Sequence, residues 1–443
     1  MTTPVSTPSA RASDSRPTVI LVGTFCPYPT IHGNHTRLAS WLKWLRTAGF
    51  RVRFILQPSI LEGDSAVRDL RAAVDQLDVV DPPSGSSGFA RSVRHILRQV
   101  IMRGLPEALA DVARRVHDRS RPSRSIIGRQ AGQPKQAEDG HIDRFCWPTT
   151  RDIVRHAIDE EHPVAVITEY ALLSKCLEDV SAPTLKIIDT HELFFRNPER
   201  FRIQGLEAPV VCTPESEIQA LARAEILVAI QKNDAVALRE VFPEKRVITV
   251  GHTYPRRDPR FRSPEPGRIL YVGSSNAFNV HGLREFLTHA WPHILSASHA
   301  AHLRIIGSCP RFDDADNTRV THVGRVSDDQ LVEEYQKARV IINPQVAGTG
   351  LKIKCVEALC AGCPLVVNSA GADGLEHYAG QAFLLAKDWT EFTQHVLQVL
   401  NDDRLAQRLR LEATRVAEEM FSEEATFSEL ALLLKRPREL GRC

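Results

Sequence analysis

The sequence predicts an α/β fold made of two doubly wound, Rossmann-like domains that face each other across a cleft, with a helical tail at the C-terminus. One β-branched apolar run begins at Thr18 and a second begins at Arg268, and each is followed by further apolar runs separated by helix-length segments. Buried parallel strands show such continuous runs, because helices cover both faces of their sheet. The length of 443 residues agrees with two domains, since a single core stops growing at about 250 to 300 residues.

The first domain opens with a strand–helix–strand unit. A strand is expected at Thr18–Gly23, then a loop over 24–34, a helix over 36–48 that ends at Gly49, and a strand over 51–56. Further strands are expected at 164–168, 185–189, 226–230 and 247–250 in the first domain, and at 268–273, 302–307, 321–323, 340–343 and 365–368 in the second. We divide the chain into a disordered tail (1–17), a first domain (18–255), a second domain (256–420) and a C-terminal helix (421–443), with a proline- and arginine-rich linker at 251–267.

The first domain carries an insertion at about 85–148. Within it, residues 91–129 hold ten arginines against three acidic residues, with apolar residues at helical spacing. Two interpretations stay open. The favoured one is a solvated insertion on the first sheet, and the other is a basic amphipathic helix that docks on an anionic membrane surface. The polar stretch 120–140 is predicted to be disordered.

A phosphate-binding turn is predicted in the run 341–367, where an apolar strand leads into a glycine-rich loop and then a helix. Gly348 and Gly350 allow backbone amides to approach an anion closely. Lys352 and Lys354 can balance phosphate charge near the positive N-terminus of the helix. Glu357 lies one helical turn further on, where a carboxylate suits ribose hydroxyls, so the turn is typical of a nucleotide site.

Residues 344–367 resemble the donor-nucleotide motif of GT-B glycosyltransferases, especially the retaining family 4 and its relatives. The matching residues include Pro344, Gly348, Thr349, Gly350, Leu351, Lys352, Lys354, Glu357, Gly362 and Pro364. The resemblance implies a GT-B fold and a nucleotide-sugar donor, with Lys354 as a catalytic residue at the diphosphate, Glu357 at the ribose and residues 348–352 around the donor. Many members carry a second glutamate where this chain has Thr349, and the subgroup with the same G-T-G sequence lacks it.

The loop 26–37 is similar to the P-Y-P-x-x-x-G loop of the same family, which borders the donor phosphates and the acceptor. The resemblance implies that Gly33 supplies a small residue and free amides at the start of the next helix. Arg37, just inside that helix, is either a cation of the site or a solvent-facing residue.

The segment 189–192 resembles a D-T-H-D segment of the family and lies at the carboxyl end of a strand, the edge where open α/β sheets bind ligands. The resemblance implies that His191 contacts the donor sugar and is catalytic. Glu192 stands in place of the commoner aspartate, and we expect it to order a neighbouring loop with Arg196 available as its partner.

Two residues of the second domain complete the predicted site. The segment 273–282 follows a strand and opens a helix, which is again a place for a phosphate or a sugar. Asn279 matches an asparagine of the G-T-G subgroup and is assigned to the donor. Arg325 either borders the nucleotide base or lies on the surface.

Composition argues against several other classes of protein. The net charge of +2 gives no reason to expect a nucleic-acid partner, and no apolar run approaches the ~20 residues of a membrane span. Nine cysteines, an odd count without paired short spacings in a small domain, fit a reducing cytoplasm better than a disulfide framework. His32 and His35 have no further ligands nearby, and Cys360 and Cys363 have no second pair, so neither zinc nor another metal cofactor is expected.

The resemblance and the composition together predict a cytoplasmic glycosyltransferase of the hexosyltransferase type. It would use a UDP- or GDP-sugar, without a cofactor or metal and with retention, on a glycan, lipid-linked or small-molecule acceptor in cell-surface polysaccharide biosynthesis. Peripheral contact with the inner membrane face is the open alternative for 91–129. A non-catalytic nucleotide-sugar-binding module and a GT-B sugar epimerase remain as other functions. A dinucleotide-dependent oxidoreductase is disfavoured, because neither first strand is followed by Gly-x-Gly-x-x-Gly.

Overall fold

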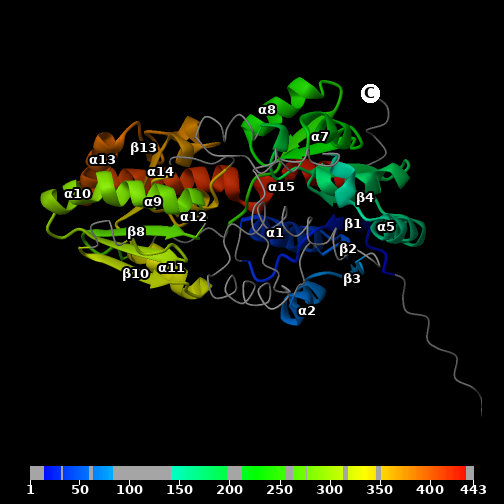
Figure 1. Ribbon diagram of the computed structural model, residues 1–443, viewed down its shortest axis with the longest axis horizontal. Helices are drawn as coiled ribbons and strands as arrows, with labels where there is room; N and C mark the ends of the chain where they lie inside the picture. Colours follow the sequence, from blue (N-terminus) through cyan, green and yellow to red (C-terminus); the bar gives the residue numbers. More distant parts are fainter. Residues whose placement is uncertain are drawn as a thin grey trace, which may run out of the picture.

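The computed structural model describes residues 14–30, 33–58, 63–82, 141–196, 212–254, 263–275, 277–312, 318–345 and 351–435. Two parallel sheets lie side by side, each with helices packed on it, and the last helices cross from the second sheet to the first (Figure 1). The predicted fold class is therefore confirmed, including the helical tail.

The first sheet has seven parallel strands in the order β3-β2-β1-β4-β5-β6-β7. Their bounds are β1 (Thr18–Gly23), β2 (Arg51–Leu56), β3 (Gln76–Val79), β4 (Ala165–Glu169), β5 (Leu185–Asp189), β6 (Ile226–Ala229) and β7 (Arg246–Thr249). The central strand β1 pairs with β2 on one side and β4 on the other, with Val19 opposite Val52 and Ala165. The strand order reverses between β1 and β4, and ligands of open α/β sheets bind beside such a reversal, at the carboxyl ends of the strands.

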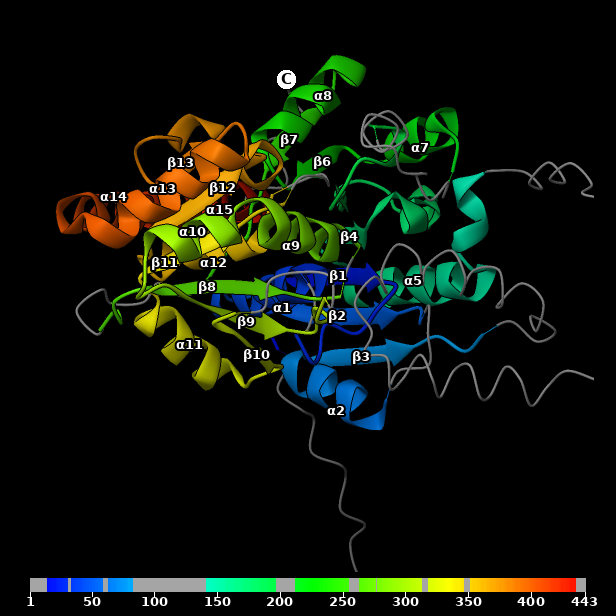
Figure 2. The same ribbon diagram turned by 60° about the vertical axis from the view of Figure 1, so that its left-hand side comes forward.

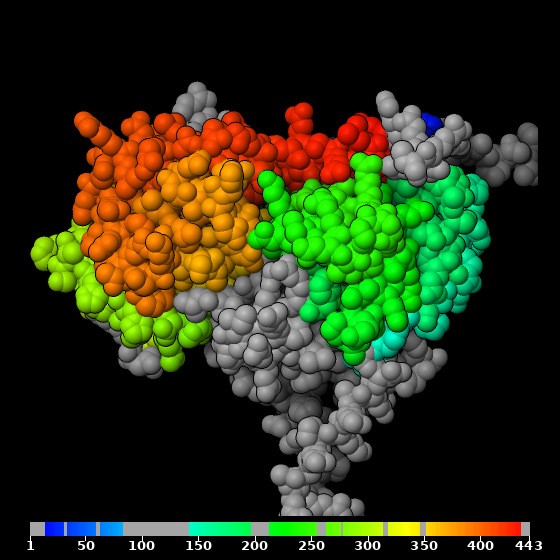
Figure 3. Space-filling model, turned by 90° about the horizontal axis from the view of Figure 1, so that it is seen from above, coloured from blue at the N-terminus to red at the C-terminus, as the bar shows by residue number. Residues whose placement is uncertain are grey.

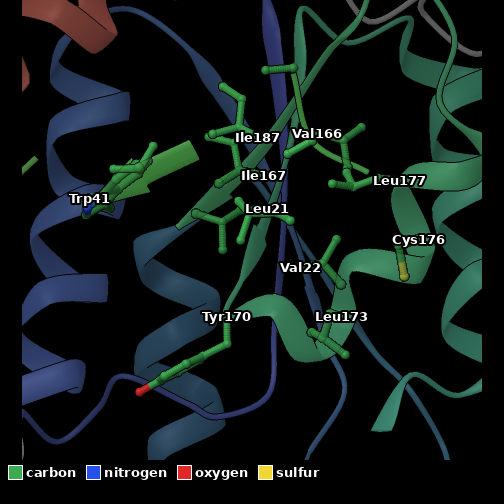
Figure 4. Close-up of a cluster of buried hydrophobic side chains, with 14 of the residues drawn as sticks. Leu21, Val22, Trp41, Val166, Ile167, Tyr170, Leu173, Cys176, Leu177 and Ile187 are labelled. Atoms are coloured by element: carbon green, nitrogen blue, oxygen red, sulfur yellow. The ribbon is translucent and has the colours of Figure 1, made fainter. Parts of the chain in front are cut away.

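The helices of the first domain are α1 (Gly33–Thr47), α2 (Asp64–Ala73), α5 (Pro148–Glu161), α7 (Pro214–Leu221) and α8 (Lys232–Val241), with 3-10 segments η1 (Ile142–Phe145), η2 (Ala171–Asp179) and η3 (Phe194–Arg196). Helix α1 starts three residues before the predicted position and ends at Thr47, one residue before the predicted end, and Gly49 follows with a φ of 89° that suits a glycine after a helix. Figure 4 shows apolar side chains of β1, β4 and β5 packed among those of α1 and η2.

The second sheet has six parallel strands in the order β10-β9-β8-β11-β12-β13. Their bounds are β8 (Arg268–Gly273), β9 (His302–Gly307), β10 (Val320–Gly324), β11 (Val340–Asn343), β12 (Leu365–Asn368) and β13 (Leu384–Ala386). Helices α9 (Ala277–His289), α10 (Trp291–Ala297) and α13 (Trp389–Asn401) cover one face. Helices α11 (Asp328–Lys337), α12 (Ile353–Cys360) and α14 (Asp403–Phe421) cover the other, and Figure 2 shows α10 and α11 on opposite sides of β8. Short 3-10 turns η5 (Ser369–Ala372) and η6 (Glu376–Tyr378) follow β12.

The final helix, α15 (Glu423–Lys435), packs on the first domain although it follows the second in sequence. Phe427 stacks on Trp44 at 4.4 Å between ring centroids and meets Trp41 edge-on at 5.8 Å. Figure 3 shows the red C-terminal helices running along both domains. Burial of these aromatic rings gives the tail a large apolar contact with α1.

Several predictions fall outside the described residues. They are most of the tail (1–13), most of the insertion (83–140, including the whole of 91–129), part of the linker (255–262), and Gly348, Thr349 and Gly350. Residues 141–148, which we assigned to the insertion, form η1 and the start of α5, with Ile142 and Phe145 buried in the first core. Within the described part of the chain, no helix is long and apolar enough to cross a membrane.

Candidate active site

His191 lies directly beyond β5 in a buried cluster of charged side chains. Its Nε2 hydrogen-bonds a carboxylate oxygen of Glu169, at the end of β4, and lies 3.3 Å from Asp189 Oδ2. Its ring stacks on Tyr170 with centroids 4.3 Å apart. Burial lowers the pKa of His191, but the carboxylates of Glu169 and Asp189 outweigh it, so the pKa lies above its usual value. The ring is therefore held towards its protonated, hydrogen-donating form.

Glu169 was not predicted as a site residue. Burial raises the pKa of this carboxyl group against the opposing attraction of His191. Its second oxygen, Oε1, is buried without a partner in the described part of the chain. The available signal was its position as the last residue of a strand next to β5, but the predicted strand stopped one residue earlier.

Arg37 is fully buried, so the solvent-facing alternative is wrong. Its Nε and Nη2 donate to the two oxygens of Asp189 at 2.8 and 2.5 Å. Its Nη1 donates to the carbonyls of Val250 and Gly251 at 2.6 and 2.8 Å. One guanidinium thus ties helix α1 to the strand end beside His191 and to the start of the segment that leads into the second domain.

A metal ion is disfavoured at this cluster by its own chemistry. Ligand atoms of Glu169, Asp189 and His191 lie within 4.8 Å of one another. Both oxygens of Asp189 already accept hydrogen bonds from Arg37, whose positive charge would repel a cation. The cluster is thus an ion-pair network of side chains.

Lys354 provides a partly buried cation on the second domain. Its Nζ donates to Asn279 Oδ1 at 2.5 Å and lies 5.2 Å from the centre of the Tyr271 ring. Asn279 in turn donates to Ser274 Oγ at 3.2 Å, which fixes its amide. Burial lowers the pKa of Lys354 to about 8. The ammonium group is therefore poorly compensated, and a bound anion would stabilise it.

Glu357 lies on α12 one turn after Lys354 and accepts a hydrogen bond from the Tyr335 hydroxyl at 2.8 Å. Burial raises the pKa of Glu357 to about 7, although Tyr335 and Lys354 both favour the charged form. A carboxyl group in this state can accept hydrogen bonds from neighbouring hydroxyls.

Two neighbouring cavities lie between the domains and share part of their lining. The larger, of about 490 Å³, is lined by Gly33 and Asn34 from the first domain and by Asn279, Lys354 and Glu357 from the second. The smaller, of about 220 Å³, which we call the inner hollow, is lined by His191, Glu192, Arg37, Asp234, Ile230, Leu193, His252 and Leu351. Gly33, Asn34, Tyr170 and Ile353 line both. A polar space bounded by a cation and by His191 is suited to an anionic ligand with a small polar group attached.

Comparison with known proteins agrees with this arrangement. Residues 266–402 match the family described as "Glycosyl transferases group 1". The match covers most of the second domain. An uncharacterised 44.6 kDa protein in the cps region of Klebsiella pneumoniae is 22% identical over 174 residues, which are 37% of this chain and 44% of that protein. The chain thus matches less than half the length of this curated relative.

Solved structures resemble the whole chain. Sucrose-phosphate synthase from Thermosynechococcus elongatus has a TM-score of 0.59 at 14% identity and covers 95% of this chain and 99% of its own. TarM has a TM-score of 0.64 at 9% identity, covering 96% and 100%. Anabaena HepE in complex with UDP has a TM-score of 0.60 at 12% identity, covering 94% and 99%. At these identities the likeness shows the fold, which is GT-B. The resemblance predicted from residues 344–367 is thus confirmed at the level of the group 1 family and the fold.

The remaining predicted residues of the group 1 domain lie close to this site. Lys352 is at the N-cap of α12, largely buried, with its Nζ 3.9 Å from Asp373 Oδ2. Leu351 lines the inner hollow and Arg325 lines the larger cavity. Cys355 and Cys363 are buried and donate to the carbonyls of Gly371 and Tyr335, each at 3.3 Å, so they serve in packing.

In the first domain Glu192 lines the inner hollow. Arg196 is the last residue of η3 and its side chain lies outside the described structure, so its pairing with Glu192 stays a prediction. Gly33 has a clear structural reason, because a Cβ there would lie 2.1 Å from Ile353 Cδ1 of the second domain.

Proposed function

We propose that the chain is a glycosyltransferase that transfers a sugar from a nucleotide-sugar donor to a glycan, lipid-linked or small-molecule acceptor, with retention and without a metal ion. The observation that carries the proposal is the partly buried Lys354, held by Asn279 and followed by Glu357, in a cavity that shares lining residues with the hollow beside His191. The group 1 match of the second domain supports it.

In this proposal the donor diphosphate lies against Lys354. A phosphate oxygen would supply the negative charge that the buried ammonium lacks, and the ammonium would stabilise the diphosphate as it leaves the sugar. Glu357 would accept hydrogen bonds from the ribose hydroxyls, with Tyr335 fixing the carboxylate. The departing charge is then balanced by this chain's own lysine.

His191 would act on the sugar. Its Nε2 is occupied by Glu169, which leaves Nδ1 as the ring nitrogen able to meet a substrate. A protonated ring donates from Nδ1 to a sugar hydroxyl or to the leaving oxygen. Because Glu169 and Asp189 stabilise the positive charge of the His191 ring, its Nδ1–H group is oriented and ready to donate before the sugar arrives.

Three of the similar proteins bear on the donor and the pathway. HepE was solved with UDP, and a TarM variant from S. aureus was solved with fondaparinux, α-GlcNAc-glycerol and UDP. These complexes favour UDP over GDP as the first donor nucleotide to test and a glycan as the first acceptor. The cps region of the Klebsiella relative is compatible with a role in cell-surface polysaccharide biosynthesis.

The test begins with a thermal-shift screen of UDP and GDP, because a ligand that binds only the folded chain raises Tm. The donor sugars of the nucleotide that binds are then incubated with the protein, and nucleotide release and sugar transfer are measured. Binding without release of nucleotide would overturn the proposal in favour of a non-catalytic module. Conversion of the sugar without transfer would favour an epimerase.

A further inference from the structure

Among the described residues at the carboxyl edge of the first sheet, His252 and Gln231 are buried with polar side-chain atoms that lack partners. His252 follows β7, is 3% exposed, and its Nδ1 has no hydrogen-bond partner in the described part of the chain. Gln231 follows β6, is also 3% exposed, and neither atom of its amide has a partner there. Buried polar groups are nearly always satisfied in folded proteins, so each exception calls for an explanation.

The surroundings of His252 differ from those of Gln231. His252 lines the inner hollow together with His191, Glu192 and Asp234. Gln231 instead lies against the second domain, with its Oε1 2.3 Å from where a Cβ on Gly374 would stand. His252 is therefore the one of the two that borders space for a ligand.

The charge state of His252 limits the chemistry of that ligand. Burial, Arg37 and His191 all hold the pKa of His252 well below its usual value, so the ring is neutral. Nδ1 of a neutral imidazole either donates or accepts one hydrogen bond, depending on the tautomer, and a hydroxyl group can complement both forms. Arg37 and His191 also line the hollow, but Asp189 and Glu169 already balance their charges. With the carboxyl groups of Glu192 and Asp234 on the same wall, the hollow suits a neutral ligand better than a negatively charged one.

Position links the inner hollow to the transferred sugar. It shares Gly33, Asn34 and Ile353 with the larger cavity that holds Lys354, and its volume of about 220 Å³ is on the scale of a single sugar ring. A donor whose diphosphate meets Lys354 can therefore place its sugar next to His191 and His252. We propose that His252 hydrogen-bonds a ring hydroxyl of the transferred sugar and makes the enzyme select a neutral hexose.

This inference rests on the proposed glycosyl transfer, and its experiment separates the two. Full-length wild type and His252→Leu would be assayed with UDP, UDP-glucose, UDP-galactose, UDP-N-acetylglucosamine and UDP-glucuronate, and with GDP and GDP-mannose. The dissociation constant of each nucleoside diphosphate and the kcat/KM of each donor would be measured. Gln231→Met, which removes the other unpartnered side chain, is the matched control.

Wild type is expected to prefer one neutral hexose over the others and over the glucuronate. In His252→Leu the ratio of kcat/KM for the preferred donor to that for the other donors should fall by about tenfold or more. This is the effect of one lost hydrogen bond to a substrate hydroxyl. The affinity for the nucleoside diphosphate alone should stay within about twofold, because the nucleotide lies in the larger cavity. Gln231→Met should keep the wild-type preference. His252→Gln, which retains a donor and an acceptor, should give an intermediate preference and serves if the leucine variant does not fold.

An unchanged preference in a folded His252→Leu variant that still turns over its donor would overturn the role of His252 and leave glycosyl transfer standing. A wild-type preference for UDP-glucuronate would also overturn it. If wild type binds neither UDP nor GDP and releases no nucleotide from any donor, both the proposed function and the inference fall.

Discussion

Replacing Arg37 by methionine should destabilise the first domain strongly. Both members of the Arg37–Asp189 pair have fully buried side chains, and the guanidinium makes four hydrogen bonds of 2.5 to 2.8 Å. Methionine fills much of the space but leaves the Asp189 carboxylate and two backbone carbonyls without their donors. Removing one partner of a buried ion pair costs about 3 to 5 kcal/mol, and we expect the free energy of unfolding of the first domain to fall by that amount.

The assay is urea denaturation followed by tryptophan fluorescence. Trp41 lies under the Arg37 guanidinium, 5.6 Å from it, and reports on the first domain. The matched control is Arg415→Met, which breaks ion pairs with Glu412 and Glu419 on the exposed face of α14 and should change stability little.

The double variant Arg37→Met with Asp189→Asn tests the cause of the loss. It removes the uncompensated charge, so it should be more stable than Arg37→Met alone. Arg37→Lys keeps the charge but not the planar set of donors and should fall between wild type and Arg37→Met. If Arg37→Met unfolds at the same urea concentration as Arg415→Met, the reasoning from the buried pair is refuted.

Three further predictions concern the donor cavity and the acceptor. Lys354→Ala should lower turnover by a factor of about 100 to 1000 at saturating donor while leaving Tm unchanged, as loss of one preorganised charge typically does, and wild-type turnover would remove Lys354 from the site. Because burial raises the pKa of Glu357 from 4.5 to about 7, the folded chain binds more protons than the unfolded chain between these values, and this group makes stability fall as pH rises through that window. Glu357→Gln should show a smaller fall in denaturant midpoint over the same pH range, and parallel curves would contradict the shift. If 91–129 docks on anionic lipid, wild type should sediment with anionic vesicles at low salt and be released by salt, whereas a variant with Arg94, Arg98 and Arg103 changed to Glu should stay in the supernatant. Equal behaviour of the two proteins would leave the segment as a solvated insertion.

Most strands could be predicted because their signal is local. The runs at β1, β2, β8 and β11 are apolar and β-branched, and buried parallel strands need nothing further to be recognised. The missed strands are edge strands with weaker patterns. The sequence of β3, QLDV, contains only two apolar residues, and the strand is only partly buried. Strand β13 is only three residues long, which is too short to show a pattern.

The contacts of the site are less predictable, since they join residues far apart in the chain. Arg37 and Asp189 are separated by 152 positions, and no local pattern distinguishes this arginine from a surface one. Glu169 meets His191 only because the sheet order places β4 beside β5. Lys354 and Glu357 were within reach of sequence reasoning because their spacing on one helix is local, whereas the contact of Lys354 with Asn279 depends on how α9 and α12 meet.

Gly33 shows how one residue can position groups on both sides of the cavity. A Cβ at Gly33 would lie 2.1 Å from Ile353 Cδ1, the end of a flexible side chain, so a larger residue would force the Ile353 side chain to move. Ile353 is the first residue of α12, and Lys354 and Glu357 follow on the same helix. Because a helical turn moves as a unit, the approach of Ile353 to Gly33 also sets how close Lys354 lies to the first domain. On the other side, Arg37 anchors the same helix α1 to Asp189, which neighbours His191. The loop 26–37, predicted to border the donor phosphates, therefore contacts α12 through Gly33 and the strand end beside His191 through Arg37.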